Sequence, residues 1–167
     1  MLTELSQIFQ SSILANHDIQ LKLDLDSELS PVLCNANALK QVYTNLIKNS
    51  VEALSEKSEI MVYTQDQVNV DGQTYVEISV VDNGPGIRPA VLNQLFKQVQ
   101  TEKGHDHAGI GLSIVKKLVT EMSGSISCRS NTKGTRFQIL LPNKWDKKHY
   151  SLCANNKNKT HESYAIE

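Results

Sequence analysis

The sequence QVYTNLIKNSVE, Gln41 to Glu52, repeats its apolar residues at helical spacing. With neighbouring positions it would present one apolar helix face, made of Leu39, Val42, Leu46, Val51 and Leu54. Carboxamides recur four residues apart, at Gln41, Asn45 and Asn49, and would form an adjacent polar stripe. The spacing therefore predicts a helix that packs on a core along one side and carries amide side chains along the next.

The amide stripe has two interpretations. Asparagine is unfavourable inside a helix, because its side chain competes for backbone hydrogen bonds. Asn45 and Asn49 could simply belong to an exposed polar face. Their oxygens could instead be ligands of Mg2+, which keeps several waters and binds substrate phosphates at the same time. The stripe alone leaves both interpretations open.

The composition indicates one domain with a proper core and excludes several kinds of partner. The chain has 167 residues and a net charge of −1, so no basic surface for nucleic acid is expected. No apolar run approaches the ~20 residues of a membrane span. Three cysteines, Cys34, Cys128 and Cys153, are far apart and lack metal-ligand spacing, which is typical of reduced thiols in a cytosolic protein.

The hydrophobic pattern predicts an α+β fold. Helices are expected over 3–15, from an Asn35–Asn37 cap to about Ser55, over 89–96 and over 111–122. The first helix should turn inward Leu5, Ile8, Phe9 and Ser12. Strands are expected over 21–25, 59–65, 74–82, 125–130 and 135–141, with a hairpin turn at Asp71-Gly72. Hairpin-linked strands without βαβ alternation favour a two-layer α/β sandwich with a mixed sheet packed on helices.

The strand that ends at Asp82 carries a second candidate. Its core face is expected to hold Val76, Ile78, Val80 and, by parity, Asp82. A buried carboxylate needs partners, and Asp82-Asn83-Gly84-Pro85-Gly86 could supply them as an Asx turn. Alternatively, Asp82 could accept a hydrogen bond from the N6 amine of adenine, while Gly84 and Gly86 let the backbone approach the base. Guanine, with its O6 acceptor, would be disfavoured.

Two further glycine motifs are weak when taken separately. Gly109-Ile110-Gly111 opens a helix, whose free N–H groups suit a phosphate, although such a pair is more often a simple helix start. Thr135, after Gly134, is expected near whatever Asp82 binds. His105-Asp106-His107 has neither the spacing nor the loop of a closed zinc site.

The order of these motifs is more specific than any one of them. The series runs Asn45 and Asn49, Asp82-x-Gly84-x-Gly86, a polar loop, Gly109-x-Gly111 and Gly134-Thr135. It resembles the catalytic ATP-binding domain of sensor histidine kinases, within the wider family of type II topoisomerases, mismatch-repair clamp ATPases and heat-shock chaperones. The resemblance covers about residues 3–141. It implies a Bergerat-type fold with the nucleotide between the helices and a mobile lid, here roughly 88–108.

The resemblance implies a role for each matching residue in binding ATP and Mg2+. Asn49 would hold Mg2+, with Asn45 beside the metal and the phosphates, and Lys48 near the phosphates. Asp82 would read adenine, with the base also contacting Gly84, Gly86, Ile87 and Thr135. The residues that would cap the phosphates are Gly109, Ile110, Gly111 and Leu112.

The lid resembles that of nitrogen-regulation kinases. Thr101-Glu102-Lys103 matches their Thr-x-Lys, in which the lysine can reach the terminal phosphate, so Thr101 and Lys103 join the site. Three departures stand out: Ser50 replaces the usual Ala, Leu95-Phe96 lacks the usual Pro-Phe, and His107 replaces a Gly. The last two put lid movement and turnover in question more than nucleotide binding.

The resemblance also implies a domain organisation and partners. Residues 1–16 would be a linker helix from a dimerisation and phosphoacceptor domain, 17–142 the catalytic domain and 143–167 a mobile tail. His17 has no phosphoacceptor setting, so the γ-phosphate is expected to pass to a histidine outside this chain, and then to a response regulator receiver domain. No autophosphorylation in cis is expected. A cytoplasmic location is expected, although the parent protein could be membrane-bound.

Other functions remain open at the level of sequence. A clamp-type ATPase needs a water-activating Glu on the Asn helix, and Glu52 lies one turn too far from position 45. A non-catalytic module that binds adenine nucleotides would keep the motifs without phosphoryl transfer. A serine kinase that acts on a regulatory partner is a further, minor alternative.

Overall fold

The structure is a computed structural model that describes residues 1–11, 18–29, 32, 34–55, 57–96 and 108–142, with side chains of 108–110 left out. The elements, in chain order, are α1 (Leu2–Phe9), β1 (Gln20–Asp24), α2 (Ala36–Ala53), β2 (Glu59–Val70), β3 (Gln73–Asp82), α3 (Pro89–Leu92), α4 (Ala108–Glu121), β4 (Ser125–Asn131) and β5 (Gly134–Pro142). Among the described residues, no helix is both long and apolar enough to cross a membrane.

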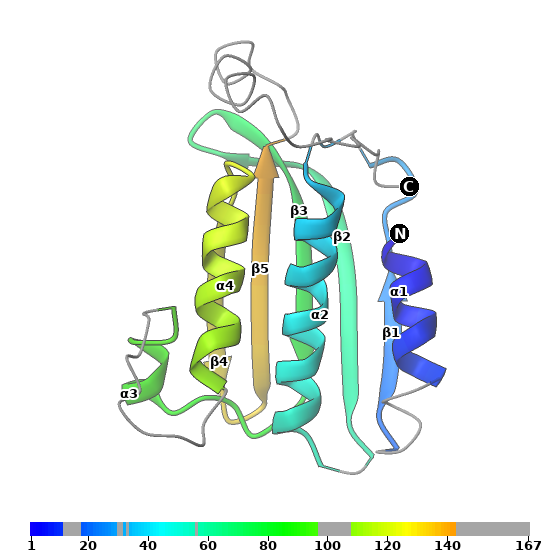
Figure 1. Cartoon of the computed structure of the whole chain (residues 1–167), viewed down its shortest axis with the longest axis vertical. Coiled ribbons are helices and arrows are strands. Elements are labelled where there is room, and N and C mark those ends of the chain that lie inside the picture. Colours follow the sequence, from blue (N-terminus) through cyan, green and yellow to red (C-terminus); the bar gives the residue numbers. More distant parts are fainter. Residues whose placement is uncertain (12–17, 30–31, 33, 56, 97–107, 143–167) are drawn as a thin grey trace.

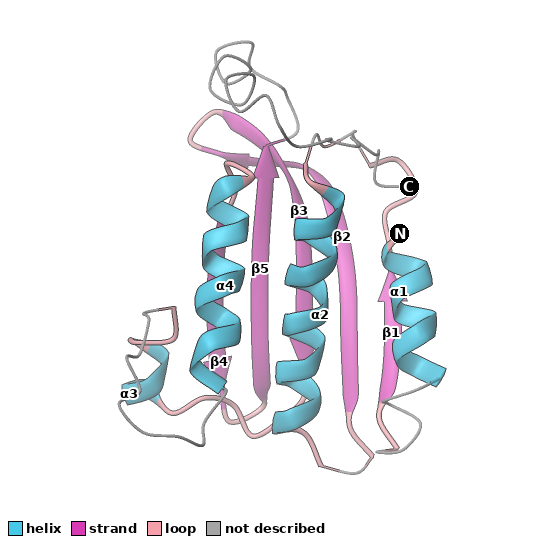
Figure 2. Ribbon diagram, in the orientation of Figure 1, coloured by secondary structure: helices cyan, strands magenta, loops and turns pink. Residues whose placement is uncertain are grey.

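The strands form one mixed sheet of five strands, in the order β1-β2-β3-β5-β4. Helices α1, α2 and α4 lie together on one face of this sheet (Figures 1 and 2). The predicted two-layer α+β architecture with a mixed sheet is therefore confirmed.

The chain does not alternate strands and helices throughout, but it contains one βαβ unit that the sequence pattern did not indicate. Strands β1 and β2 are parallel, with Leu21 paired to Ile60, and α2 crosses over between them. Consecutive parallel strands require such a crossover, because a tight turn reverses the chain direction and makes the next strand antiparallel. The other neighbouring pairs, β2–β3, β3–β5 and β4–β5, are antiparallel.

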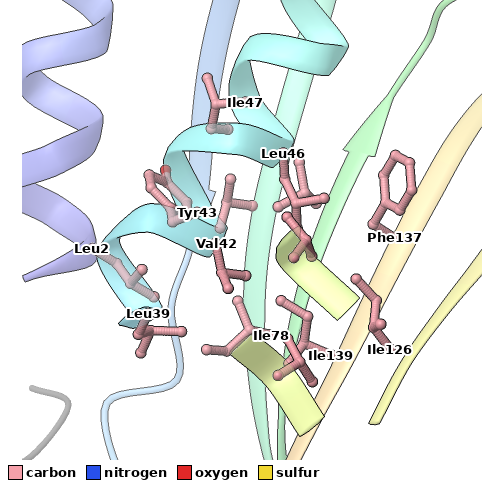
Figure 3. Close-up of a cluster of buried hydrophobic side chains, with 14 of the residues drawn as sticks. Leu2, Leu39, Val42, Tyr43, Leu46, Ile47, Ile78, Ile126, Phe137 and Ile139 are labelled. Carbon is pink, nitrogen blue, oxygen red and sulfur yellow. The ribbon is translucent and has the colours of Figure 1, made fainter. Parts of the chain in front are cut away.

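The core lies between the helices and the sheet (Figure 3). From α2 it takes Leu39, Val42, Tyr43, Leu46 and Ile47, and from the two central strands Val76, Ile78, Val80, Phe137, Ile139 and Leu141. Val51 and Leu54, predicted for the same helix face, are only partly buried. Tyr43 and Ile47 thus widen the apolar face of α2 beyond the stripe predicted from spacing.

Both ends of α2 have local causes. The Asn35 side chain accepts a hydrogen bond from the Ala38 N–H at 3.0 Å, which is the predicted N-cap. The helix ends at Ala53, slightly before the expected Ser55, because Leu54 is already extended.

The predicted inward face of the first helix is confirmed for Leu5 and Phe9, which pack in or against the core, but not for Ile8. The helix ends at Phe9, and Ile8, which was expected to face inward, is 61% exposed. The buried positions are Leu2, Ser6 and Phe9, spaced i, i+4, i+7. The Ser6 hydroxyl hydrogen-bonds to the Tyr43 hydroxyl of α2, and Phe9 packs edge-on against Tyr43. Ser12 lies outside the described residues.

Strand β2 runs five residues past its predicted end at Gln65. A bulge between Gln65 and Val68 shifts the register, which then continues to the β2–β3 turn. Asp71 and Gly72, with φ of 50° and 81°, form this turn, so the predicted hairpin is confirmed.

The segments beside the expected lid also differ from prediction. Helix α3 is one turn, Pro89–Leu92, rather than extending to Phe96, although Leu95 and Phe96 do pack partly against the core. Helix α4 begins at Ala108, three residues before the predicted start. Residues 97–107 and 143–167, with most of the expected lid and the expected tail, lie outside the described residues.

Candidate functional site

The candidate motifs meet at one end of the molecule. The C-terminal end of α2, the end of β3, the β4–β5 turn and the start of α4 all lie at the lower end in Figure 1. An open depression at this end is lined by Ala53, Leu54, Ser55, Ser58, Asn83, Gly84, Pro85 and Thr132. The predicted series of motifs is thus brought together in space by α2 and the central strands.

Asp82, the last residue of β3, is 5% exposed and points into the helix-covered side of the sheet. Its Oδ1 accepts two backbone hydrogen bonds, from Gly84 N–H at 3.0 Å and Thr135 N–H at 3.2 Å. Its Oδ2 accepts one from the Ser50 hydroxyl at 3.3 Å. The Asx-turn interpretation is therefore correct for Oδ1, while Oδ2 is left with one hydroxyl partner.

Burial dominates the electrostatics of Asp82. It raises the pKa of the carboxyl group, and the hydrogen bonds from Gly84, Thr135 and Ser50 lower that pKa only in part. A carboxylate with this residual cost gains from another donor, such as an amine. Asp82 is thus a buried hydrogen-bond acceptor directly before Asn83 and Gly84, which line the depression.

The loop after Asp82 lies tightly against its surroundings. Gly86 has a φ of +77°, and a Cβ there would come within 1.9 Å of the Asn131 carbonyl oxygen in the β4–β5 turn. At Gly84 a Cβ would lie 3.0 Å from Asp82 Oδ1 and 3.1 Å from Leu54 Cδ2. Gly86 is therefore a position that only glycine fits, whereas a Cβ at Gly84 would require its neighbours to shift by a few tenths of an ångström.

Ser130, which the sequence analysis did not single out, anchors the same loop to β5. Its hydroxyl accepts the Ile87 N–H at 2.8 Å, and lies 3.0 Å from the Thr135 hydroxyl and 3.2 Å from the Gly134 carbonyl. Ile87 and Thr135, both predicted site residues, are thus joined through Ser130. Nothing in the local sequence identifies Ser130, because its partner Ile87 is 43 residues away.

Asn83 hydrogen-bonds the loop to β2, the strand on the other side of β3 from β5. Its Oδ1 accepts the Glu59 N–H at 2.9 Å, and its own N–H donates to the Glu59 carbonyl at 3.3 Å. The Asn side chain therefore continues the β2–β3 ladder past the end of β3. The loop that begins at Asp82 is held at both edges before it reaches α3.

The amide stripe lies beside the start of α4. Asn45 and Asn49 are half-buried, and Lys48 is exposed. Asn49 Nδ2 is buried and has no hydrogen-bond partner among the described residues. Its Oδ1 lies 3.8 Å from where a Cβ on Gly111 would stand. The Asn49 amide thus faces the first turn of α4, where helix N–H groups have no partner within the helix.

The second glycine motif lies within this first turn. Gly109, Ile110, Gly111 and Leu112 are all helical, and because α4 begins at Ala108, only Gly109 and Ile110 of these four lie early enough for their N–H groups to lack a partner within the helix. The Leu112 side chain is buried in the core and cannot itself contact a ligand bound at the start of α4. Thr101 and Lys103 lie outside the described residues, as does the His105-Asp106-His107 run.

Cys128 of β4 is a neighbour of Asp82 that the sequence analysis read only as a reduced thiol. Burial, together with the negative charge of Asp82, raises the pKa of the Cys128 thiol to about 12. The thiol is therefore neutral at physiological pH and lines the helix-facing side of the sheet as a small apolar group.

Comparison with known proteins agrees with this geometry. The family model of histidine kinase-, DNA gyrase B- and HSP90-like ATPases matches residues 34–144. Sporulation kinase E of Bacillus subtilis (strain 168) is 34% identical over 126 residues, covering 75% of this chain and 16% of that protein. Sensory histidine kinase/phosphatase NtrB of Rhizobium meliloti (strain 1021) is 34% identical over 135 residues, covering 74% of this chain and 35% of that protein. The chain thus spans about a sixth to a third of these relatives.

Solved structures give the same result. The nucleotide-free catalytic domain of histidine kinase ThkA matches with a TM-score of 0.70 at 26% identity, covering 85% of this chain and 89% of that one. ThkA in complex with the response regulator protein TrrA matches with a TM-score of 0.67 at 25% identity, covering 86% of this chain and 39% of that one. Motif order, fold and relatives agree, and the chain belongs to the histidine kinase-, DNA gyrase B- and HSP90-like ATPase family, as an ATP-binding domain of the sensor histidine kinase type.

Proposed function

We propose that this chain binds ATP with Mg2+ and acts as the catalytic domain of a sensor histidine kinase, which transfers the γ-phosphate to a histidine of a dimerisation domain. The observation that supports this most is that two polar side chains at one end of the molecule have buried atoms with unused hydrogen-bonding capacity. Asp82 Oδ2 has one hydroxyl donor, and Asn49 Nδ2 has no partner among the described residues. The amine of an adenine base would donate to Asp82 Oδ2, and the metal-bound phosphates of the nucleotide would lie against Asn49 Nδ2.

Asp82 would recognise the base. A carboxylate accepts a hydrogen bond from the N6 amine of adenine, whereas it would repel O6 of guanine. The held backbone from Gly84 to Ile87 would form the surface beneath the base, with Thr135 beside it. This assignment predicts adenine selectivity without any contact from the lid.

Asn49 would hold Mg2+, with Asn45 beside it. The buried Nδ2 of Asn49, a donor with no partner among the described residues, fits an acceptor such as a phosphate oxygen. The amide oxygen of the same side chain would be a suitable hard ligand for Mg2+. When bound, Mg2+ neutralises charge on the phosphates of ATP. The backbone N–H groups at the start of α4, at Gly109 and Ile110, would bind the phosphates from the opposite side, with Gly111 and Leu112 following them in the same motif.

The lysines would act as positive charges. Lys48 is exposed on α2, close in sequence to both asparagines, and would approach the phosphates from solvent. We assign Thr101 and Lys103 to the lid by resemblance, with Lys103 at the terminal phosphate. Phosphoryl transfer depends mainly on such positioning and charge neutralisation.

Transfer would form a bond between the γ-phosphorus and an imidazole nitrogen, and break the bond to the β-phosphate oxygen, releasing ADP. The proposed acceptor lies in a dimerisation domain joined through residues 1–16, with 17–142 as the catalytic domain. The structure of ThkA with the response regulator TrrA makes a receiver domain the expected next acceptor. We place these reactions in the cytoplasm.

Calorimetric titration with a non-hydrolysable ATP analogue tests the binding part of this proposal. We expect micromolar affinity, roughly −8 kcal/mol, dependent on Mg2+, with no comparable heat for the GTP analogue. Asp82→Asn should remove binding, while Asp71→Asn, an exposed aspartate in the β2–β3 turn, should leave it unchanged. A wild-type chain that binds neither nucleotide would overturn the proposal.

The transfer step needs a separate measurement. The chain is mixed with γ-labelled ATP and a purified dimerisation domain of a related kinase, with its histidine intact or replaced by glutamine. Acid-labile label on the intact domain alone is the expected result. Nucleotide binding with no label on any such domain would instead favour a non-catalytic nucleotide-binding module.

A further inference from the structure

Ser50 is buried on α2 and contacts the carboxylate at the base of the site. It is 2% exposed, and its hydroxyl reaches Asp82 Oδ2 at 3.3 Å across 32 residues of sequence. It immediately follows Asn49. One turn of α2 therefore carries the proposed metal ligand and a direct contact to the proposed base-reading residue.

The two oxygens of Asp82 are not equivalent. Oδ1 already accepts two hydrogen bonds, from Gly84 and Thr135. A carboxylate oxygen has about two lone-pair sites, so Oδ1 has little capacity for a further donor. Oδ2 accepts only from Ser50. The acceptor site left for a ligand is thus on Oδ2, and the Ser50 hydroxyl determines which side of that oxygen stays free.

We propose that Ser50 is a positioning residue for nucleotide specificity: its hydroxyl orients the free acceptor site of Asp82 Oδ2 toward the N6 amine of adenine. This rests on the proposed function, because it assumes that Asp82 reads the base. Backbone donors hold Oδ1 from the loop and from β5, and Ser50 supplies the contact from α2. Without it, the carboxylate keeps its charge and burial but loses one of its orienting donors.

The predicted effect depends on the base. A nucleotide with the N6 amine uses Oδ2, so it should bind Ser50→Ala about three- to tenfold more weakly, the range for one modest hydrogen bond. Purine riboside diphosphate lacks that amine, makes no use of Oδ2 and should be unaffected. A role for Ser50 in folding alone would weaken both ligands together, so the difference between them isolates positioning.

The experiment titrates wild type, Ser50→Ala, Ser50→Thr and Ser6→Ala with ADP and with purine riboside diphosphate. Ser6 is the matched control, because it is also a buried serine on a helix, at 3% exposure, but lies in α1. We expect Ser50→Ala to lose affinity for ADP only, Ser50→Thr to recover at least half of that loss on a logarithmic scale, and Ser6→Ala to change neither affinity.

The outcomes separate this inference from the proposed function. If wild type binds ADP and Ser50→Ala loses affinity for both ligands equally, or for neither, the role of Ser50 is overturned and the proposed function stands. If wild type binds neither ligand, both are overturned. Thermal unfolding of each variant accompanies the titrations, so that a loss of folded protein is not read as a loss of specificity.

Discussion

Arg136 Nη2 lies 2.7 Å from Glu77 Oε1. Both residues alternate along their strands with core residues such as Ile78 and Phe137, so they belong to the sheet face opposite the core. Glu77 is nevertheless only 3% exposed. Ser79 and Gln138 also donate to its carboxylate, at 2.7 and 2.6 Å, and the Arg136 guanidinium lies over the Tyr63 ring. This face of the sheet is therefore held by a polar network instead of by apolar packing.

Glu77→Gln should destabilise the fold by about 2 kcal/mol, since it removes a charge that a buried network is built to hold. Burial opposes ionisation of Glu77, but its hydrogen bonds and Arg136 together hold its pKa below the ordinary carboxyl value. Because the pKa of Glu77 is lower in the folded than in the unfolded state, its ionisation stabilises the fold at pH values above the unfolded-state pKa. This stabilisation is lost as the pH falls through the folded-state pKa. The variant should therefore converge with wild type in acid, as measured by urea unfolding against pH.

Glu121→Gln is the matched control for this prediction. Glu121 pairs with Lys117 at 3.9 Å with both side chains exposed, a geometry that contributes little. Equal destabilisation by both variants, or a Glu77→Gln difference that persists below the pH of carboxyl titration, would contradict the assignment. ADP affinity should be unchanged in both variants.

Asp82→Asn should stabilise the protein by about 1 kcal/mol at neutral pH while it removes nucleotide binding. Asn Oδ1 can keep the Gly84 and Thr135 donors, and its amide can donate to the Ser50 hydroxyl. Burial raises the folded pKa of Asp82 above its ordinary value. The contribution of Asp82 to wild-type stability is therefore fully present at pH values below its unfolded-state pKa, and it is lost as the pH rises through its folded-state pKa.

The stabilisation by Asp82→Asn should accordingly vanish at low pH. Differential scanning calorimetry of both proteins across the acid range measures it directly. A variant that is less stable than wild type at neutral pH would show that Asp82 is a structural carboxylate. Nucleotide binding by wild type should also weaken as pH falls and Asp82 becomes protonated.

Gly86→Ala should cost more than 3 kcal/mol and disturb the site, because its Cβ would overlap the Asn131 carbonyl at 1.9 Å. Gly72→Ala is the control: Gly72 also has a positive φ, of +81°, but nothing lies within 4 Å of its Cβ position. It should cost only about 1 kcal/mol of backbone strain. Chemical unfolding compares the two, and equal losses would mean that the contact with the β4–β5 turn is unimportant.

Asn49→Ala and Asn35→Ala should have opposite signatures, although both change an asparagine of α2 or its cap. Asn35 caps the helix, so its loss should cost about 1 kcal/mol and leave Mg2+-dependent binding intact. Asn49 carries a buried amide nitrogen without a partner among the described residues, so alanine should leave stability unchanged or raise it.

In the same pair of variants, Mg2+-dependent binding of ATP should be lost with Asn49→Ala alone. Thermal unfolding together with titration in Mg2+ and in EDTA separates the two effects. A large loss of stability for Asn49→Ala would indicate that this amide serves the fold instead of a ligand.

Local chemistry was sufficient to predict much of this protein. Apolar spacing predicts the buried face of α2, Asn35 marks its start, and Asp71-Gly72 marks the β2–β3 hairpin. The alternation along β3 correctly places Asp82 on the core side. Each of these follows from residues within one turn or one strand, where the helical and strand repeats alone determine direction.

Tertiary structure determined the rest. The parallel pairing of β1 with β2, the Ser50 hydroxyl on Asp82, the Ser130 hydroxyl on the Ile87 amide, and the burial of Glu77 on the sheet face opposite the core all join distant segments. No local repeat encodes these contacts, since they form only after the strands have taken their order in the sheet. The sequence by itself determined which groups face the site, and only the packing of α2 against that sheet decided which of their hydrogen bonds remain for a ligand.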